Sequence, residues 1–266
     1  MRGMADIGIS RAGRVVVVEL RDGPLNFAST ANMNQVGDAL FAAEADGARA
    51  GVICSDGKAF CAGAQFGGDD GARAKSFGNF VQTDEKSDIG PFYEAALRLF
   101  SVSIPLVAAV HGPAVGAGFG LALACDLRVI CPETFMSTNF VRLGIHPGFG
   151  ISLVLPELVG AARASDILLT GRRISGTECF ELGLANRLVP QADVRATAMA
   201  LATEIASAAP LAVQSTRKTL RGDLAARVRT RLAHERKTQN WLSTTSDAEE
   251  GIAAMLGKRD PDFTGK

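Results

Sequence analysis

The sequence predicts an α/β fold in one continuous domain. Two short apolar runs rich in β-branched residues, at 15–18 and 51–54, end at turn residues, as strands buried on both faces do. From residue 161 onward the pattern is almost wholly helical, and no linker rich in serine, proline or glycine separates this part from the rest. We therefore expect a strand-rich core over residues 1–195 and a helical C-terminal region over residues 196–266, packed as layers of one domain.

The elements follow from the pattern in chain order. After the strand at 15–18, Thr30 can cap a helix whose apolar residues recur at helical spacing up to Gly47. The strand at 51–54 follows, and right-handed crossovers are expected throughout. The remaining elements are strand 106–110, helix 116–124, strand 127–130, helices 161–169, 177–182, 193–208 and 211–221, a charged helix ending near Trp241, and helix 247–256, with one interruption at 187–189.

Residues 66–91 differ from the rest of the chain. They combine a glycine- and aspartate-rich start with mixed charge and little periodicity. Structureless loops beyond about 15 residues are usually lids, binding loops or disordered segments. A lid over a site and a solvated insertion are equally compatible with this segment.

Composition excludes several classes of function. The chain has 28 Lys+Arg and 28 Asp+Glu residues, so no overall field attracts a polyanion and no nucleic-acid partner is expected. The five cysteines are odd in number and never spaced as C-x-x-C, which argues for reduced thiols rather than disulfides or a zinc site. The N-terminus lacks a signal-peptide pattern, and glycine and proline interrupt the long apolar stretch at 106–125. We expect a cytoplasmic protein with no membrane partner.

Residues 113–122 follow a strand, are rich in glycine and open a helix. Free N–H groups at the positive end of a helix dipole suit an oxyanion or a phosphate, although tight helix–sheet packing would also require glycine there. The dinucleotide fingerprint needs a glycine at Leu121, and the Gly-Lys-Ser/Thr and Gly-x-Ser-x-Gly motifs are absent. A nicotinamide dehydrogenase, a P-loop nucleotidase and a nucleophile-elbow hydrolase are therefore not expected.

A second loop of small residues, 59–66, also follows a predicted strand. One N–H group from each loop could converge on a carbonyl oxygen that becomes negative during a reaction. With these two loops the chain resembles the crotonase superfamily, the enoyl-CoA hydratase/isomerase family, over nearly its whole length. The resemblance rests on the order of segments 24–27 (PLNF), 60–64 (FCAGA), 111–118 (HGPAVGAG), 126–128 (DLR), 143–148 (LGIHPG), 168–174 (LLTGRRI) and 259–263 (RDPDF).

The resemblance implies a crotonase-like spiral of ββα units with a helical, oligomerising C-terminal region. It implies homotrimers or dimers of trimers that bind acyl-CoA thioesters, with no metal and no cofactor apart from the coenzyme A of the substrate. The backbone N–H groups of Ala64 and Ala117 would form an oxyanion hole around the thioester carbonyl. The coenzyme A arm would meet the main chain near these residues: Asn26, Phe27, Ala62, Gly63, Ala64 and Gly116.

The resemblance also exposes missing acids. Hydratases of the family carry two glutamates at positions that are Gly120 and Phe140 here, and some isomerases carry an acid at the position of Gly148. Addition of water to an enoyl thioester needs one group to take a proton and another to deliver one, and such assistance contributes about 10²- to 10⁴-fold. A site with donors alone is expected to bind and polarise a thioester but to hydrate it poorly.

Other groups could replace these acids. His146 lies in a segment that contributes to the family's pocket and has a suitable pKa, although it could equally be a packed histidine. For His111 a turn histidine is favoured, and His234 is expected on a solvated helix face. If the 66–91 segment closes over the site, four further residues could enter it: Asp69, Asp70, Tyr93 and Glu94.

The sequence thus predicts an enzyme of this family that acts on an acyl-CoA thioester through a stabilised enolate, with non-standard acid/base groups. Two alternatives stay open. One is a catalytically silent acyl-CoA-binding subunit, and the other is a thioester hydrolase or decarboxylase on the same fold. Acyl chain, pathway and reaction direction do not follow from the residues.

Overall fold

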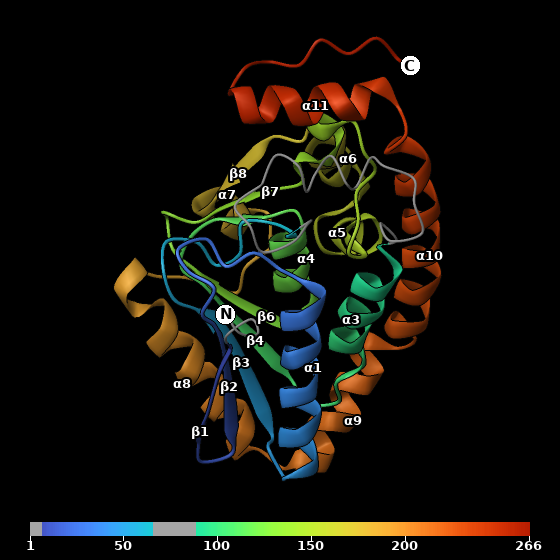
Figure 1. The fold of residues 1–266 in the computed structure, drawn as a ribbon. Helices are drawn as coiled ribbons and strands as arrows, with labels where there is room; N and C mark the ends of the chain where they lie inside the picture. The colour runs from blue at the N-terminus through green and yellow to red at the C-terminus, as the bar shows by residue number, and fades with distance from the viewer. Residues whose placement is uncertain (1–6, 66–88) are drawn as a thin grey trace, which may run out of the picture.

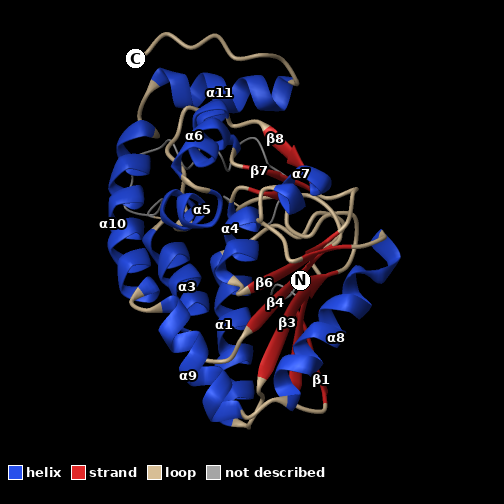
Figure 2. Cartoon of the chain, turned by 180° about the vertical axis from the view of Figure 1, so that it is seen from behind, coloured by secondary structure: helices blue, strands red, loops and turns tan. Residues whose placement is uncertain are grey.

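The computed structural model describes residues 7–65 and 89–266 (Figures 1 and 2). Its main sheet has the strand order β1-β2-β3-β4-β6-β9, with β1 antiparallel to β2 and the other pairs parallel. The strands are β1 (Ile7–Ala12), β2 (Val15–Leu20), β3 (Ala50–Ser55), β4 (Leu106–Val110), β6 (Leu127–Ile130) and β9 (Arg187–Leu188).

Both faces of this sheet are covered. Val16, Val18 and Ile53 pack into the cluster that also holds α1 (Thr30–Ala45) and α3 (Gly90–Ser101). The intervening residues of β2 and β3 pack instead against α8 (Val194–Ser207), on the other side of the sheet (Figures 1 and 2). Alternate side chains therefore enter different cores, which explains why the runs at 15–18 and 51–54 are apolar and confirms that these strands are buried on both faces.

A second, smaller sheet and further helices complete the fold. The small sheet has the order β5-β7-β8. Within the described ranges no single helix is long and apolar enough to span a bilayer. One bent pair of helices, Gln191–Ser207 with Pro210–Arg221, passes the test for length and composition, and on no other ground. The remaining elements are β5 (Ala114–Val115), β7 (Phe135–Ser137), β8 (Arg173–Ser175), α4 (Ala117–Ala124), η2 (Asn139–Leu143), α5 (Ile151–Val159), α6 (Ala161–Thr170), α7 (Gly176–Glu181), η3 (Gln191–Asp193), α9 (Pro210–Arg221), α10 (Leu224–Leu242) and α11 (Ser246–Gly257).

Three local expectations were wrong. Ser29, not Thr30, caps α1, because its hydroxyl accepts the Asn32 N–H while the Asn32 amide oxygen accepts the Ser29 N–H in a capping box. Helix α3 already begins at Gly90, so the segment expected as a loop to residue 91 ends earlier. The helical last third is interrupted twice, at β8 as well as at β9.

Helix α4 is buried along its whole length, so its ends need internal partners. At the C-terminal end, Arg128 donates to the carbonyls of Ala122 (3.3 Å) and Cys125 (2.8 Å), and Arg221 donates to the carbonyl of Ala124 (2.7 Å). Two cations thus offset the negative end of this helix dipole. The positive end, at Ala117, is directed toward the candidate site described below.

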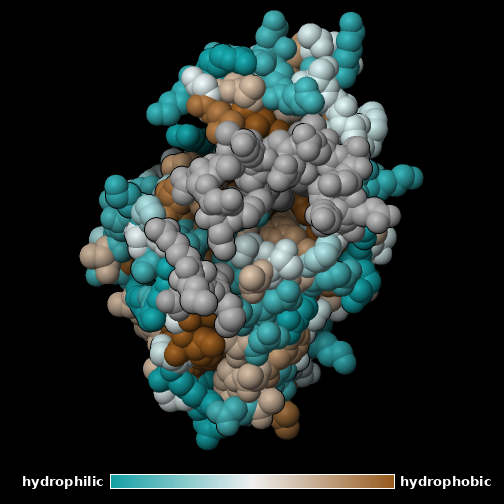
Figure 3. All heavy atoms as spheres, viewed as in Figure 1, coloured by the Kyte–Doolittle hydropathy of each residue, from teal (hydrophilic) through white to brown (hydrophobic). Residues whose placement is uncertain are grey.

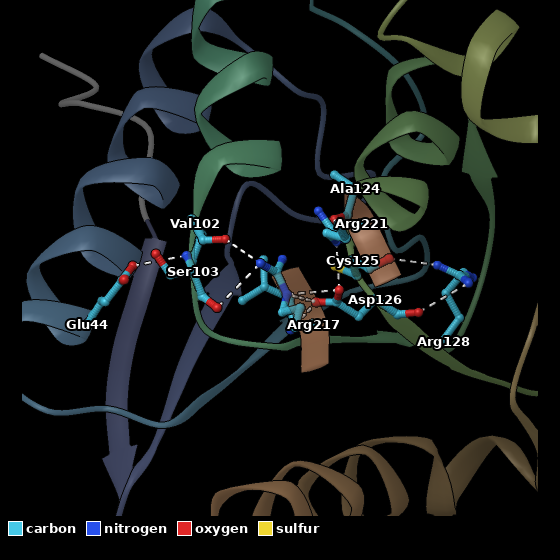
Figure 4. A network of polar contacts seen from close by, with 10 residues as sticks. Glu44, Val102, Ser103, Ala124, Cys125, Asp126, Arg128, Arg217 and Arg221 are labelled. Atoms are coloured by element: carbon cyan, nitrogen blue, oxygen red, sulfur yellow. Dashed lines mark hydrogen bonds and ion pairs between the residues drawn. The ribbon is translucent and has the colours of Figure 1, made fainter. Parts of the chain in front are cut away.

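A buried ionic network fixes α9 to the sheet (Figure 4). Asp126 accepts hydrogen bonds from Arg217 (2.9 Å) and Arg221 (2.7 Å), and it also accepts the Leu106 N–H at the start of β4 (2.8 Å). The side chains of Asp126, Arg217 and Arg221 are only 18%, 10% and 14% exposed. One carboxylate therefore pairs with both guanidinium groups in a region largely shielded from water.

Helix α10 places a carboxylate inside the protein. Glu235 is 0% exposed and accepts hydrogen bonds from the Gly150 N–H (2.8 Å) and the Ser152 hydroxyl (2.6 Å). Burial raises the pKa of Glu235 to about 7, although these hydrogen bonds oppose the shift. The carboxylate ties α10 to the start of α5.

We predict that Asp126→Asn destabilises the protein by about 3 kcal/mol or more, because two buried guanidinium groups lose their counter-charge. The matched control is Asp38→Asn, which removes an ion pair with Arg98 in which Asp38 is 68% exposed. An exposed pair contributes at most about 1 kcal/mol. Urea unfolding measures both losses, and equal losses would contradict the role assigned to Asp126.

A second prediction concerns pH. Because the pKa of Glu235 is raised in the folded state, this residue favours folding at low pH, and that contribution is lost as the pH rises through about 7. The unfolding free energy of the wild type should fall by up to about 3 kcal/mol more than that of Glu235→Gln between pH 5 and pH 8.5. Urea titrations at both pH values test this, with the exposed Glu181→Gln as control. Identical pH slopes for wild type and Glu235→Gln would refute it.

Candidate active site

A ladder of backbone hydrogen bonds brings together the two loops singled out in the sequence. N–H groups of loop 58–65 donate to carbonyls of loop 24–28. On its other side, Cys61 donates to the carbonyl of Pro113 (3.1 Å) and accepts the N–H of Val115 (3.0 Å). Loop 58–65 therefore lies between loop 24–28 and β5, immediately before α4.

The ladder fixes the direction of the Ala64 N–H. The Gly63 carbonyl accepts the Ala28 N–H (2.8 Å), and Ala28 in turn accepts the Gln65 N–H (2.6 Å). A trans peptide unit is planar, with its carbonyl and its N–H on opposite sides. The Ala64 N–H therefore points away from Ala28, toward the side on which β5 and α4 lie.

The same argument applies at α4. The Gly116 carbonyl accepts the Gly120 N–H (3.0 Å) along the helix. The Ala117 N–H, in the same peptide unit as that carbonyl, therefore points out of the N-terminal end of α4, where the helix dipole is positive. Gly116 itself has φ +52°, a conformation that favours glycine.

The side chain of Asn26 holds loop 24–28 against the chain that follows β3. Asn26 is 0% exposed with φ +51°, and its amide donates to the carbonyls of Asp56 (2.5 Å) and Ala59 (2.8 Å). The amide nitrogen of Asn26 therefore bonds within the protein, whereas its buried Oδ1 has no hydrogen-bond partner among the described residues. Phe27, Ala62 and Gly63 lie on the same two hydrogen-bonded loops, with Phe27 half-buried.

The glycines of α4 admit close neighbours. A Cβ at Gly118 would lie 2.0 Å from the Cys61 carbonyl oxygen, so the packing explanation holds at this position. A Cβ at Gly120 would lie 2.5 Å from ring carbons of Phe149, which is 1% exposed and has φ +61°. Any side chain at position 120 therefore requires Phe149 to move.

The space beside Gly148 is also occupied, in this case by a side chain of α3. A Cβ there would lie 2.1 Å from the Tyr93 hydroxyl oxygen. This hydroxyl donates to the amide oxygen of Gln239 (2.6 Å), and the Gln239 amide donates to the His146 carbonyl (2.6 Å). Burial holds the pKa of Tyr93 well above its usual range, so the phenol stays neutral.

The structure does not bring His146 to the two alanine N–H groups by any described contact. Its Nδ1 lies 2.6 Å from the Pro147 carbonyl, and its ring packs edge-on against His234, with centroids 5.6 Å apart. Burial lowers the pKa of His146. Glu94, with its side chain 73% exposed, lies near Arg229 (3.8 Å) at the surface.

Two further candidates lie outside the described residues, namely Asp69 and Asp70. His111 is a turn histidine, with Nε2 3.1 Å from the Gly57 carbonyl. A cavity of about 280 Å³ lies at the ends of β3 and β4; its lining includes Ser55, His111 and Arg195 but neither Ala64 nor Ala117. In the described part of the chain no three His, Cys, Asp or Glu side chains form a metal-binding group.

Sequence reasoning missed Asn139 as a neighbour of this site. Its amide oxygen would lie 3.9 Å from a Cβ on Gly116, and the tip of the Phe140 ring would lie 3.6 Å from the same point. Both residues are half-buried and begin η2. No local motif marks Asn139, because its proximity to α4 arises only when η2 folds over Gly116.

Known proteins resemble this chain in sequence and in fold. A solved enoyl-CoA hydratase/isomerase from Pseudoalteromonas atlantica T6c is 26% identical with a TM-score of 0.85, covering 97% of this chain and 99% of its own. A carnitinyl-CoA hydratase from Mycobacterium avium is 29% identical with a TM-score of 0.84, covering 99% and 100%. Among curated sequences, the 2,3-dehydroadipyl-CoA hydratase of Escherichia coli K12 is 33% identical over 268 residues, or 99% and 100% of the two chains.

These neighbours have the crotonase fold expected from the sequence, with its helical C-terminal region. The family model for enoyl-CoA hydratase/isomerase matches residues 10–266. The chain therefore belongs to the enoyl-CoA hydratase/isomerase family of the crotonase superfamily.

Proposed function

We propose that this family member binds an acyl-CoA thioester and stabilises the enolate form of its acyl group, using backbone donors and no carboxylate at the three usual acid positions. The observation that carries the proposal is the direction of the Ala64 and Ala117 N–H groups, set by the carbonyls of Gly63 and Gly116. Hydrogen bonds from such fixed donors stabilise negative charge as it develops on the thioester oxygen. The coenzyme A arm then runs along the main chain of loops 24–28 and 58–65.

Proton transfer is the step at which this chain departs from a hydratase. Phe140 stands beside Gly116, and the rings and hydroxyl of Phe149 and Tyr93 fill the space beside Gly120 and Gly148. None of these groups is an acid or base near neutral pH. His146 is the proposed substitute, and its lowered pKa favours the neutral form that accepts a proton.

A second candidate function is a silent acyl-CoA-binding subunit. It is favoured by the placement of Phe149, which excludes a side chain at position 120. Exchange of substrate α-protons with deuterated water separates the two functions, because only an enzyme that forms the enolate exchanges them. Tight coenzyme A binding without exchange across a panel of thioesters supports the binding subunit, whereas release of free coenzyme A or carbon dioxide indicates hydrolysis or decarboxylation.

Assembly as homotrimers or dimers of trimers belongs to the same proposal. Large apolar side chains are exposed on the C-terminal helices, including Leu211 (79%), Leu220 (82%) and Trp241 (66%). Hydrophobic residues also gather beneath α11 on the face shown in Figure 3. Burying such surface against neighbouring copies would be favourable.

Binding should polarise the thioester. We predict that the carbonyl stretch of a bound unsaturated thioester moves to lower frequency, and that Ala117→Pro reduces this shift by deleting one donor. Proline suits the first position of a helix, which limits damage to the fold. Ala117→Gly is the matched control, because it keeps the N–H and should keep the full shift. Infrared difference spectra give the answer, and an unshifted wild-type band would remove the oxyanion-hole assignment.

Phe149 blocks the space that an acid at position 120 would need, and replacing Phe149 should remove this block. We predict little hydration of crotonyl-CoA by the wild type, and little more by Gly120→Glu with Phe140→Glu, because the side chain introduced at position 120 collides with Phe149. Adding Phe149→Gly should raise the activity above that of the double variant, since both acids then have room.

Circular dichroism must show that all these variants are folded, because removing a buried phenylalanine costs about 3 to 5 kcal/mol. Hydration is followed by the loss of enoyl absorbance. A wild type that turns over crotonyl-CoA at about 10 per second or faster would overturn the proposed loss of acid/base function.

A further inference from the structure

Phe140 differs from the other aromatic residues near α4 in being accessible. Phe149 and Phe92 are 1% and 7% exposed and pack edge to face with centroids 5.7 Å apart. Phe140 is half-buried, and the tip of its ring approaches Gly116, directly before the Ala117 N–H. Of these three described aromatic residues, it is therefore the one that a ligand held at Ala117 would meet.

The position of this ring is fixed by its backbone. The Phe140 carbonyl accepts the Ile145 N–H (3.0 Å), which closes the turn after η2. Just before η2, the Thr138 hydroxyl donates to the Ile167 carbonyl on α6 (3.0 Å). The ring is thus presented by an anchored segment, which lowers the entropic cost of using it as a binding surface.

We propose that Phe140 makes the site selective for acyl groups that carry an aromatic ring next to the thioester carbonyl. The inference rests on the proposed function, because it requires the thioester carbonyl to sit at the Ala64 and Ala117 N–H groups. The first acyl carbons then lie at the N-terminal turn of α4, beside the ring. Two π-systems attract each other in offset or edge-to-face arrangements beyond the effect of buried area alone.

Phe140 also stands at one of the two positions where hydratases of the family carry an acid. A phenyl group cannot exchange a proton, so it contributes to recognition and not to water addition. It also leaves the aromatic acyl group in a less polar environment than a carboxylate would. Selectivity for the aromatic acyl group is therefore expected to be measurable by binding alone, without turnover.

The experiment compares two thioesters with equal numbers of heavy atoms, benzoyl-CoA and cyclohexanecarbonyl-CoA, by isothermal titration calorimetry. The wild type should bind benzoyl-CoA about tenfold more tightly, the upper range for one aromatic pair. Phe140→Leu should reduce this ratio to near one, and Phe140→Tyr should keep it. Phe135→Leu is the control, because Phe135 is also half-buried but lies on β7 against Arg173.

The outcomes separate this inference from the proposed function. If neither thioester binds more tightly than coenzyme A alone, the proposed function fails and the inference fails with it. If both bind tightly but equally, or if the preference survives in a folded Phe140→Leu protein, the inference alone is overturned. Should Phe140→Leu not fold, Phe140→Met provides the same comparison with a flexible side chain of similar size.

Discussion

The burial of α4 on all sides constrains most of the structure around it. A helix of eight residues with no face toward water must have small side chains where other backbones touch it, and its terminal polar groups must be satisfied internally. Arg128 and Arg221 satisfy the carbonyl end, and Asp126 neutralises Arg221 in turn. At the N–H end, no side chain in the described part of the chain caps the helix, and this is the end that the proposed function assigns to the ligand. The ionic network and the candidate site are thus two consequences of one buried helix.

Sequence patterns predicted the parts of the fold that depend on local regularity. The valine-rich strands and the long amphipathic helices follow from residue spacing, and their burial is as expected. The short strands β5, β7 and β8 escaped detection because two or three residues carry no periodicity. Helix α3 was not predicted. One reason is that its start adjoins the aperiodic segment that precedes it. The capping residue was misplaced by one position, since serine and threonine are both suitable caps.

The candidate site was predictable only to the level of its loops. Two glycine-rich loops following strands indicated donors, but the roles of Ala64 and Ala117 came from family resemblance. The contact between Phe149 and Gly120 joins residues distant in the chain, so no local motif could reveal it. Likewise, Glu235 lies in a run of charged residues that is typical of a solvated helix face. Its position on α10, however, directs this carboxylate into the core. A run of charged residues describes only the composition of a helix. Whether one of its side chains is buried depends on which face of the helix packs against the core.

The packing of the Phe149 ring against Gly120 has an evolutionary consequence. A glutamate at position 120 would collide with its ring, while loss of the ring alone would leave a void in a packed core. Each single step toward a carboxylate at this position is therefore harmful by itself, and only the combination is tolerated. Such sign epistasis makes the glycine hard to reverse once Phe149 is in place.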